Sequence, residues 1–346
     1  MLGLTDEEFW DASLVDQPAL AERLFDAGFT GVALDAPGVV DVDARATLPM
    51  IGARVATYAD LRRVSFRHHA MLVATRLESN VTLAALAESP DRLPPERPEP
   101  PRDRPVQRGT GAVFTWSDAR ERLGLPWRPG TYVLRLVLEE VASAPVRVRL
   151  VRAPSHVDPQ LEAHLAARRL TPYPQHVSPP PEAGRDLPSY RPSSDGPAPP
   201  AAPGVELAAP RVAVLGRPCV VRGALRLVPT RGEVVRPRPP QTEPTPPGGG
   251  WQEVGDDEAT AVVRVTLLVV TEGRSVPATI ELHVPCYEAI ADPAAPGEVT
   301  ASFAVDLQRL APFAGPQTCF LYALSGEHAA GPARVAMIPP EMLRGE

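Results

Sequence analysis

Proline is the feature of this sequence that most restricts its fold, since 44 of the 346 residues are proline. Proline lacks a backbone N–H donor and blocks the helical turn before it, so a chain this rich in proline is not mostly helical. Short strands, tight turns and extended connections tolerate the residue. With 44% apolar residues and this length, the chain can still form the cores of two or three ordinary domains.

Short apolar runs separated by Gly and Pro predict β structure from residue 31 onward. Within the runs, Val, Leu, Ala and Thr alternate with Arg or Asp, which is typical of strands with one buried face. Turn signals recur roughly every 8–12 residues, the spacing of a β-sandwich. The clearest predicted strands are Val64–Arg76, Thr131–Glu139, Val146–Val151, Thr260–Val270 and Thr279–Val284.

The first residues predict helices instead. Thr5 and Glu8 have the spacing of a capping box, and Asp16 followed by Pro18 marks a second helix start. Residues that would share one face of this second helix are Leu20, Leu24 and Phe25. We expect this segment to pack on the neighbouring domain; a helix that binds a partner is the alternative.

Proline-rich stretches divide the rest of the chain. They occur at 90–105, at 173–203 and at 229–250, where extended structure is expected. The predicted organisation is a helical segment at 1–30, a first β-sandwich at 31–151, a linker with one short helix at 152–203, and a second β-sandwich at 204–346 that contains the insert 229–250.

An internal repeat links the two predicted sandwiches. Gly31-Val-Ala-Leu-Asp-Ala-Pro37 matches Gly204-Val-Glu-Leu-Ala-Ala-Pro210 at five of seven positions. Further matches follow in the same order: Met71–Thr75 with Leu267–Thr271, Phe114 and Asp118 with Phe303 and Asp306, and Arg147-Val148 with Arg334-Val335. Self-similarity in a fixed order predicts the tandem duplication of one unit.

Pro129-Gly-Thr-Tyr-Val-Leu134 resembles the sixth strand of immunoglobulin-like domains. In that family a Tyr near the strand start forms a tyrosine corner, and the resemblance assigns this role to Tyr132. It also implies that Cys219 and Cys319 correspond to the inter-sheet cysteine pair, as a disulfide or as two core thiols. A fibronectin type III-like or jelly-roll variant fits the same pattern, so the expected fold is all-β with two sandwiches.

Charge and composition narrow the classes of partner. The net charge of −7 argues against a nucleic-acid-binding protein. An acidic start and the absence of an 18-residue apolar run predict neither a secretory signal nor a membrane span. We therefore expect a cytoplasmic protein with reduced cysteines. The chain contains no lysine, a bias typical of GC-rich bacterial genomes.

Four histidines and one cysteine are candidate metal ligands. His68 and His69 adjoin within a predicted strand, where neighbours point to opposite faces and cannot easily share an ion. His283 and Cys286 form a close pair, to which His328 would have to be added, and a zinc site usually needs four ligands. The sequence therefore predicts no metal site and no cofactor.

Motifs of catalysis are also missing from the sequence: it has neither a nucleophile elbow nor a phosphate-binding loop. We expect a non-catalytic protein-interaction, adaptor or structural protein whose partners are proteins, not nucleic acids or membranes. Proline-rich segments and Trp251, as an exposed anchor, are candidate contacts. The alternatives are a metal-binding protein or an accessory to a metalloenzyme, and a carbohydrate-binding module.

Overall fold

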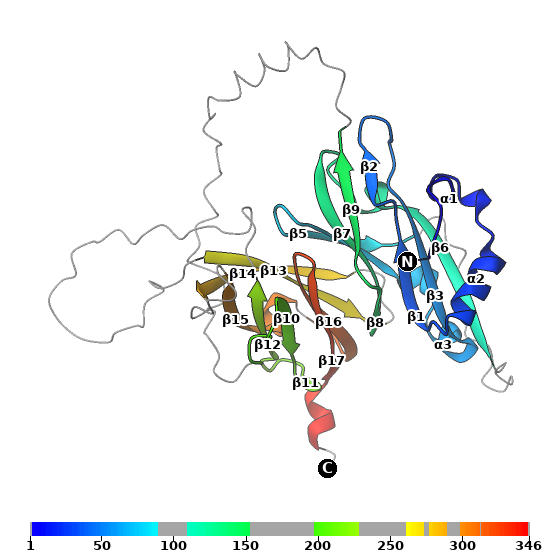
Figure 1. Ribbon diagram of the computed structural model, residues 1–346. Coiled ribbons are helices and arrows are strands. Elements are labelled where there is room, and N and C mark those ends of the chain that lie inside the picture. The colour runs from blue at the N-terminus through cyan, green and yellow to red at the C-terminus, as the bar shows by residue number, and fades with distance from the viewer. Residues whose placement is uncertain are drawn as a thin grey trace, which may run out of the picture.

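The chain folds into two β-sandwiches, and its first helices lie against the first sandwich (Figure 1). The computed structural model describes residues 2–88, 109–152, 197–227, 261–272, 277–288, 298–311 and 313–344. Strands dominate the regular structure of this part, so the protein is all-β, as predicted. The short helix expected in the linker and the insert 229–250 lie outside the described residues. None of the helices in the described part has the length and apolar composition of a membrane-spanning segment.

The first helix, α1 (Asp6–Trp10), begins at the predicted capping box. The Thr5 N–H donates to the Glu8 carboxylate at 2.7 Å, and the Glu8 N–H donates to the Thr5 hydroxyl at 3.3 Å. Both N–H groups would otherwise lack partners at the helix start. A single 3-10 turn, η1 (Ala12–Leu14), follows.

Asp16 caps the second helix, α2 (Gln17–Asp26), and Pro18 lies in its first turn. Leu20 is the fully buried residue of this helix. Phe25 is 39% exposed, so the predicted apolar face is narrower than expected. The cluster beneath the helices contains Leu2, Leu20, Ile51 and Ala53, with Leu4, Phe9, Leu24 and Trp116 packed around it. The N-terminal helices therefore cover the outer face of one sheet of the first sandwich.

The first sandwich has two sheets, with strand orders β1-β3-β6 and β2-β9-β7-β4-β5. Neighbouring strands are antiparallel except β2 and β9, which are parallel, and the short β8 pairs with β7. Its elements are β1 (Gly31–Asp35), β2 (Val39–Asp41), β3 (Pro49–Thr57), α3 (Tyr58–Arg63), α4 (Phe66–His69), β4 (Met71–Arg76), β5 (Val81–Leu86), β6 (Thr110–Asp118), α5 (Ala119–Leu123), β7 (Gly130–Leu138), β8 (Val141–Ala142) and β9 (Val146–Val151).

The second sandwich has one continuous strand order, β10-β12-β15-β14-β13-β16-β17-β11. Strand β14 joins its two sheets, because it pairs with β13 along most of its length and with β15 at its end. The elements are β10 (Gly204–Ala208), β11 (Val212–Val214), β12 (Val220–Leu227), β13 (Ala261–Thr271), β14 (Ala278–Glu288), β15 (Val299–Asp306), α7 (Leu307–Leu310), β16 (Gln317–Ser325), β17 (His328–Ile338) and the 3-10 helix η4 (Pro340–Arg344).

The strands of the two sandwiches follow the same order in space. In each, the first, third and sixth strands form one side, and a short second strand lies parallel to the last strand on the other side. Among the residues that the structure describes, this is the order of an immunoglobulin-like sandwich without the fourth strand of its first sheet.

Equivalent turns support this correspondence residue by residue. The Asp118 carboxylate accepts the N–H of Leu48 at 2.9 Å, and the Asp306 carboxylate accepts the N–H of Cys219 at 2.9 Å. Each aspartate also caps the helix that follows it, α5 or α7. Both therefore fasten the start of the third strand to the end of the sixth.

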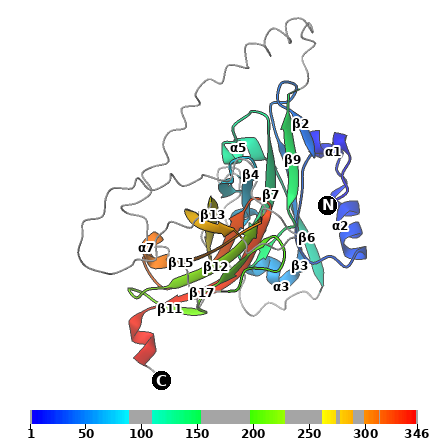
Figure 2. The same ribbon diagram turned by 60° about the vertical axis from the view of Figure 1, so that its left-hand side comes forward.

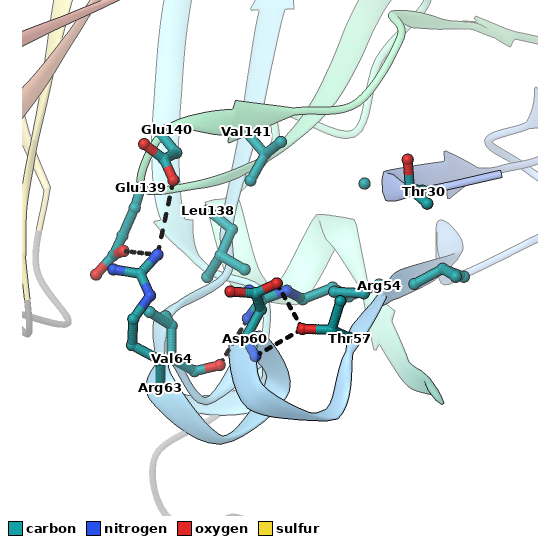
Figure 3. A pocket seen from close by; sticks show the side chains of 13 residues that line it. Thr30, Arg54, Thr57, Asp60, Arg63, Val64, Leu138, Glu139, Glu140 and Val141 are labelled. Atoms are coloured by element: carbon teal, nitrogen blue, oxygen red, sulfur yellow. Dashed lines mark hydrogen bonds and ion pairs between the residues drawn. The ribbon is translucent and has the colours of Figure 1, made fainter. Parts of the chain in front are cut away.

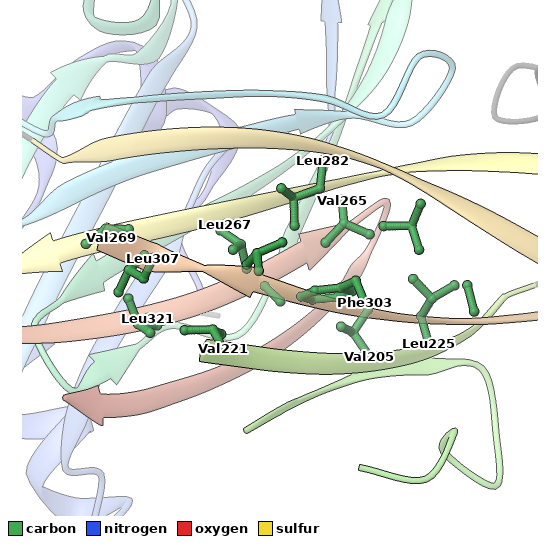
Figure 4. Close-up of a cluster of buried hydrophobic side chains, with 14 of the residues drawn as sticks. Val205, Val221, Leu225, Val265, Leu267, Val269, Leu282, Phe303, Leu307 and Leu321 are labelled. Atoms are coloured by element: carbon green, nitrogen blue, oxygen red, sulfur yellow. The ribbon is translucent and has the colours of Figure 1, made fainter. Parts of the chain in front are cut away.

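Each sandwich has its own hydrophobic core (Figure 4 shows the second). In the second core the Phe303 ring lies over Gly223 of β12, where an added Cβ would be 2.2 Å from the ring. Gly52 has the same place in β3, because Leu34 and Leu207 are their partners on the first strands. A glycine is needed at Gly223 because the ring fills the space of a side chain.

A third apolar cluster lies between the two sandwiches, where β4, β5 and β7 of the first face β13 and β16 of the second. Figure 2 shows β4, β7 and β13 close together. Strands β4, β7 and β16 are consequently buried on both faces. From one side of the molecule to the other, the layers are the N-terminal helices, the two sheets of the first sandwich and the two sheets of the second sandwich. The residues of this interface are Met71, Val73, Leu86 and Val137 from the first sandwich and Leu268, Val270, Phe320, Tyr322 and Leu324 from the second.

Asn80 fixes the relative position of the two sandwiches. It lies in the β4–β5 turn with φ +52° and is 1% exposed. Its Nδ2 donates to the Arg264 carbonyl at 2.5 Å and to the Ser325 hydroxyl at 3.0 Å, and its Oδ1 accepts the Gly326 N–H at 2.6 Å. Asparagine tolerates this left-handed backbone better than most residues. Its side-chain amide extends from the turn and bridges the interface.

Candidate functional site

A hollow of about 350 Å³ opens at one end of the first sandwich (Figure 3). It lies where β3 runs into α3, beside the turn that connects β7 to β8. Apolar side chains form part of its wall, among them Val64, Leu138 and Val141. Its charged wall residues are Arg54, Asp60, Arg63, Glu139 and Glu140.

Arg54 occupies an interior position of β3. Successive residues of a strand point to opposite faces. Met50, four residues earlier, belongs to the core between the sheets, whereas Ile51 and Ala53 face the N-terminal helices. Arg54 shares the inward face with Met50 and is 5% exposed. A charged side chain therefore stands where the alternation calls for an apolar one.

The second sandwich has leucine at the equivalent position. Val32 pairs with Arg54, and its counterpart Val205 pairs with Leu225. Leu225 is fully buried in the second core. The sandwich architecture is therefore satisfied by an apolar residue here, and packing alone does not explain the arginine.

The electrostatic surroundings of Arg54 are those of a desolvated cation. Its Nη1 donates to the Val64 carbonyl at 2.6 Å, the one hydrogen bond of this side chain within the described residues. Burial lowers the pKa of Arg54, and the Asp60 carboxylate partly opposes this shift. The guanidinium remains charged at neutral pH. It thus offers further N–H donors at the hollow.

Arg63 lies at the rim with acidic neighbours. Its Nη2 is 3.8 Å from Glu139 Oε2 and 3.6 Å from Glu140 Oε1, and its Nη1 is 4.0 Å from Glu272 Oε1 of the second sandwich. The Arg63 side chain is 51% exposed, so water screens these ion pairs and each contributes little to stability. These glutamates nevertheless neutralise the positive charge of Arg63.

The backbone of Glu139 is held in a strained conformation by the second sandwich. Its φ is +47°, which is uncommon for a residue other than glycine and costs on the order of 1–3 kcal/mol. The Tyr322 hydroxyl donates to the Glu139 carbonyl at 2.5 Å. Burial, more than the nearby Glu140 and Glu139, raises the pKa of Tyr322, so this hydroxyl stays a donor at neutral pH. The turn at the hollow is therefore preorganised by contacts from both sandwiches.

A guanidinium in such a place can bind an oxygen ligand. Its planar set of donors matches the two oxygens of a carboxylate and can also bind a carbonyl. Within the described residues, no cluster of three or more His, Cys, Asp or Glu is arranged to hold a metal ion.

His68 and His69 lie on helix α4, so the prediction that they belong to a strand is wrong. The Ala70 N–H donates to the Phe66 carbonyl at 2.9 Å, which closes a helical turn before the strand begins. Ser65 Oγ is 2.6 Å from His68 Nδ1, and the two imidazole centroids are 6.5 Å apart. The buried Phe66 accounts for the turn, because it packs into the first core.

The other metal candidates are distributed over two strands. His283, on β14, has its Nε2 2.7 Å from Glu281 Oε1. Cys286 belongs to the same strand, and its side chain lies outside the described part. His328 begins β17.

Cys219 and Cys319 form no disulfide, and both are fully buried in the second core. Cys219 directly precedes β12, and Cys319 lies in β16. The Sγ of Cys319 is 3.9 Å from the Thr271 hydroxyl. Of the two alternatives, the structure therefore contains two core thiols between the sheets and not a disulfide.

We expect Cys219 to resist alkylation in the folded protein. Burial, with smaller contributions from Asp306 and Cys319, raises the pKa of this thiol to about 11. Because the thiolate is the nucleophile, iodoacetamide should modify Cys219 at least about 100-fold more slowly at pH 7.5 in buffer than in urea. Peptide mapping by mass spectrometry after timed quenching measures both rates. Equal rates in the two solvents would contradict the assignment.

Tyr132 has the geometry of a tyrosine corner. Its hydroxyl donates to the carbonyl of Pro126, six residues earlier, at 3.4 Å, and the ring is buried in the first core. Burial raises the pKa of Tyr132, so the hydroxyl keeps its proton. The contact ties the start of β7 to the segment that follows α5.

Trp251 lies outside the described residues. Two of the other tryptophans pack within the first sandwich. The Trp127 indole N–H points at the carbonyls of Val42 and Arg45, each at 3.0 Å, and Trp116 lies in the cluster beneath the N-terminal helices. These positions are structural and do not form an exposed aromatic platform.

Arg54 was not identified from the sequence, although a signal for it exists. Gly52-Ala53-Arg54 and Gly223-Ala224-Leu225 are the same segment of the repeat with a different third residue. Aligning these strands would have placed an arginine opposite a core leucine. The matches found in the sequence, Gly31–Pro37 and Met71–Thr75, lie before and after this strand.

Comparisons with known proteins found no matching family model and no matching curated protein. Among solved structures, the chain is similar to red sea bream transglutaminase (9% identity, 94% of this chain and 34% of that chain, TM-score 0.19). It is also similar to a D1–D4 ectodomain fragment of ICAM-5 (10% identity, 88% of this chain and 53% of that chain, TM-score 0.17). A third is a putative membrane anchored protein from Corynebacterium diphtheriae (8% identity, 89% and 53%, TM-score 0.16). The chain spans about a third to a half of these proteins, and the fold assignment rests on its own strand order.

Proposed function

We propose that this chain is a non-catalytic, cytoplasmic protein-interaction module built by tandem duplication of one immunoglobulin-like sandwich. The repeat in the sequence, the common strand order and the equivalent glycines Gly52 and Gly223 support the duplication. The apolar interface and the bonds of Asn80 support a rigid pair of sandwiches rather than two independent ones. A rigid scaffold suits the presentation of a binding surface made of turns.

The hollow at the end of the first sandwich is the observation that carries this proposal. Its walls come from α3 and the β7–β8 turn, and Tyr322 of the second sandwich holds that turn in place. Strained backbone that is held by surrounding structure is typical of functional sites. In this interpretation the first sandwich carries the binding surface and the second sandwich supports it.

Site-specific photocrosslinking tests the proposal. Thr30 is exposed and lies at the hollow, so Thr30→p-benzoylphenylalanine should crosslink a single protein partner in living cells of the native host. Arg128 precedes β7 and lies at the opposite end of the same sandwich, which makes the same replacement at Arg128 the matched control. We expect a crosslinked species from Thr30 and none from Arg128. Equal labelling from both positions, or none from Thr30 across growth conditions, would refute the module.

A further inference from the structure

We propose that the hollow binds the C-terminal carboxylate of a partner polypeptide and that Arg54 is the residue that receives it. This inference rests on the proposed function, because it identifies the chemical group that a protein partner would present. Three features of the site carry it: the position of Arg54, its hydrogen bonding, and the charges around it.

The position of Arg54 indicates a ligand. The equivalent Leu225 shows that leucine satisfies the fold at this place in the strand. Removing a guanidinium from water is costly unless opposite charge and hydrogen bonds compensate for it. The first sandwich bears this desolvation cost at Arg54, whereas the second sandwich avoids it with Leu225. We infer that the charge of Arg54 serves to bind a ligand.

The hydrogen bonding of Arg54 is incomplete. With 5% of its surface exposed, it makes one hydrogen bond within the described part of the chain, to the Val64 carbonyl. A guanidinium has five N–H donors, and two of them on one edge match a carboxylate. A bound carboxylate would supply both the acceptors and the negative charge.

The acidic residues around Arg54 determine which kind of carboxylate ligand fits the hollow. Arg63 is matched by Glu139 and Glu140, and Asp60 lies near Arg54, so a simple anion would meet excess negative charge. A ligand that presents an N–H donor next to its carboxylate avoids this repulsion, because the donor can face the acids. The terminal residue of a polypeptide has this arrangement, and Leu138 can contact its side chain. The volume of about 350 Å³ is at the small end of ligand sites, which suits one or two residues.

Two peptide libraries test the inference on the full chain. Both consist of N-acetylated tetrapeptides; one has a free C-terminal carboxylate and the other a C-terminal amide. We expect the acid library to shift the Nε–H signal of Arg54 in an NMR titration and to bind at least about 10-fold more tightly than the amide library. Acetate alone, which lacks the N–H donor, should bind more weakly than the acid library.

Arg54→Leu should reduce binding of the acid library at least about 10-fold. Its urea midpoint should equal or exceed that of the unaltered protein, since Leu225 already shows leucine in this place. Arg54→Lys keeps the charge without the planar donors and should recover part of the binding. Arg128→Leu, an exposed arginine at the other end of the sandwich, should bind normally.

Equal binding of the acid and amide libraries, or binding of neither, would overturn the carboxylate assignment. These outcomes are distinguishable from failure of the module. If Thr30 still crosslinks a partner and Arg54→Leu does not weaken the crosslink, the hollow is an interaction surface that recognises another group. If Thr30 crosslinks nothing, the proposed function itself fails.

Discussion

Gly223→Ala is expected to destabilise the protein by roughly 3 kcal/mol, since the new methyl group overpacks the second core. The added Cβ would lie 2.2 Å from Phe303 Cζ and 2.4 Å from Cε1, far inside contact distance. The ring is 1% exposed and has little room to move away. The free energy of unfolding, measured by urea titration, should fall by this amount, with the loss concentrated in the second sandwich.

A second glycine of the same sandwich and a double variant make this prediction specific. Gly315→Ala places its Cβ in open space, so it should change stability by less than about 0.5 kcal/mol. In a Phe303→Leu background, Gly223→Ala should cost less than about 1 kcal/mol, because the clash is gone. If the alanine costs as much with leucine as with phenylalanine, the ring is not the reason for the glycine.

Val270→Asp is expected to separate the two sandwiches. Val270 is 2% exposed in the apolar cluster between them, and an unpaired carboxylate buried there costs several kcal/mol, on the order of 3–5. The radius of gyration measured by small-angle X-ray scattering should rise. We expect the unaltered protein to unfold in one transition and the variant in two, because each separated sandwich would then unfold by itself.

Val212→Asp is the matched control. It is the same change in the same sandwich, at an edge-strand residue that is 52% exposed. It should leave both the scattering profile and the unfolding transition unchanged. A compact Val270→Asp protein with one transition would mean that the interface does not hold the sandwiches together.

The fold class was predictable from the sequence because its signals are local. Proline and glycine mark the ends of strands whatever lies around them, and the capping box of Thr5 and Glu8 forms within one turn of helix. The repeat likewise points to two sandwiches with the same strand order. The proposed duplication would account for that shared order.

The phase of the repeated strands was harder to predict. Matching Met71 to Leu267 sets a residue of the interface beside a residue of the second core. Matching Phe114 to Phe303 makes the same error, because Phe114 faces the N-terminal helices. A shift of one residue exchanges the faces of a strand. When a strand is apolar on both faces, its sequence does not show which residues face which side, so the two possible alignments cannot be distinguished.

The interface between the sandwiches did leave a signal. The run Met71–Ala74 has no polar residue, whereas β15 alternates strictly between buried and half-buried positions. Continuous apolar runs are typical of strands covered on both sides. The runs therefore predict a second layer over these sheets, but not which surface provides it, since that depends on contacts between distant parts of the chain.

The candidate site was predicted least well, for a physical reason. Histidine, cysteine and tryptophan draw attention by type, while Arg54 is one of many arginines and is unusual only in its surroundings. Its burial, its single hydrogen bond and its equivalence to Leu225 are properties of the folded chain. Sequence reasoning could reach it only through a correct alignment of the two halves.

Face-to-face packing of the sandwiches has a consequence for synthesis. A ribosome completes the first sandwich at residue 151 and needs about 10–40 s more to reach the last strand of the second sandwich. During that time Met71, Val73 and Val137 form an uncovered apolar sheet face. The exposed face makes the partly synthesised chain, and any truncated form that ends after the first sandwich, prone to aggregate.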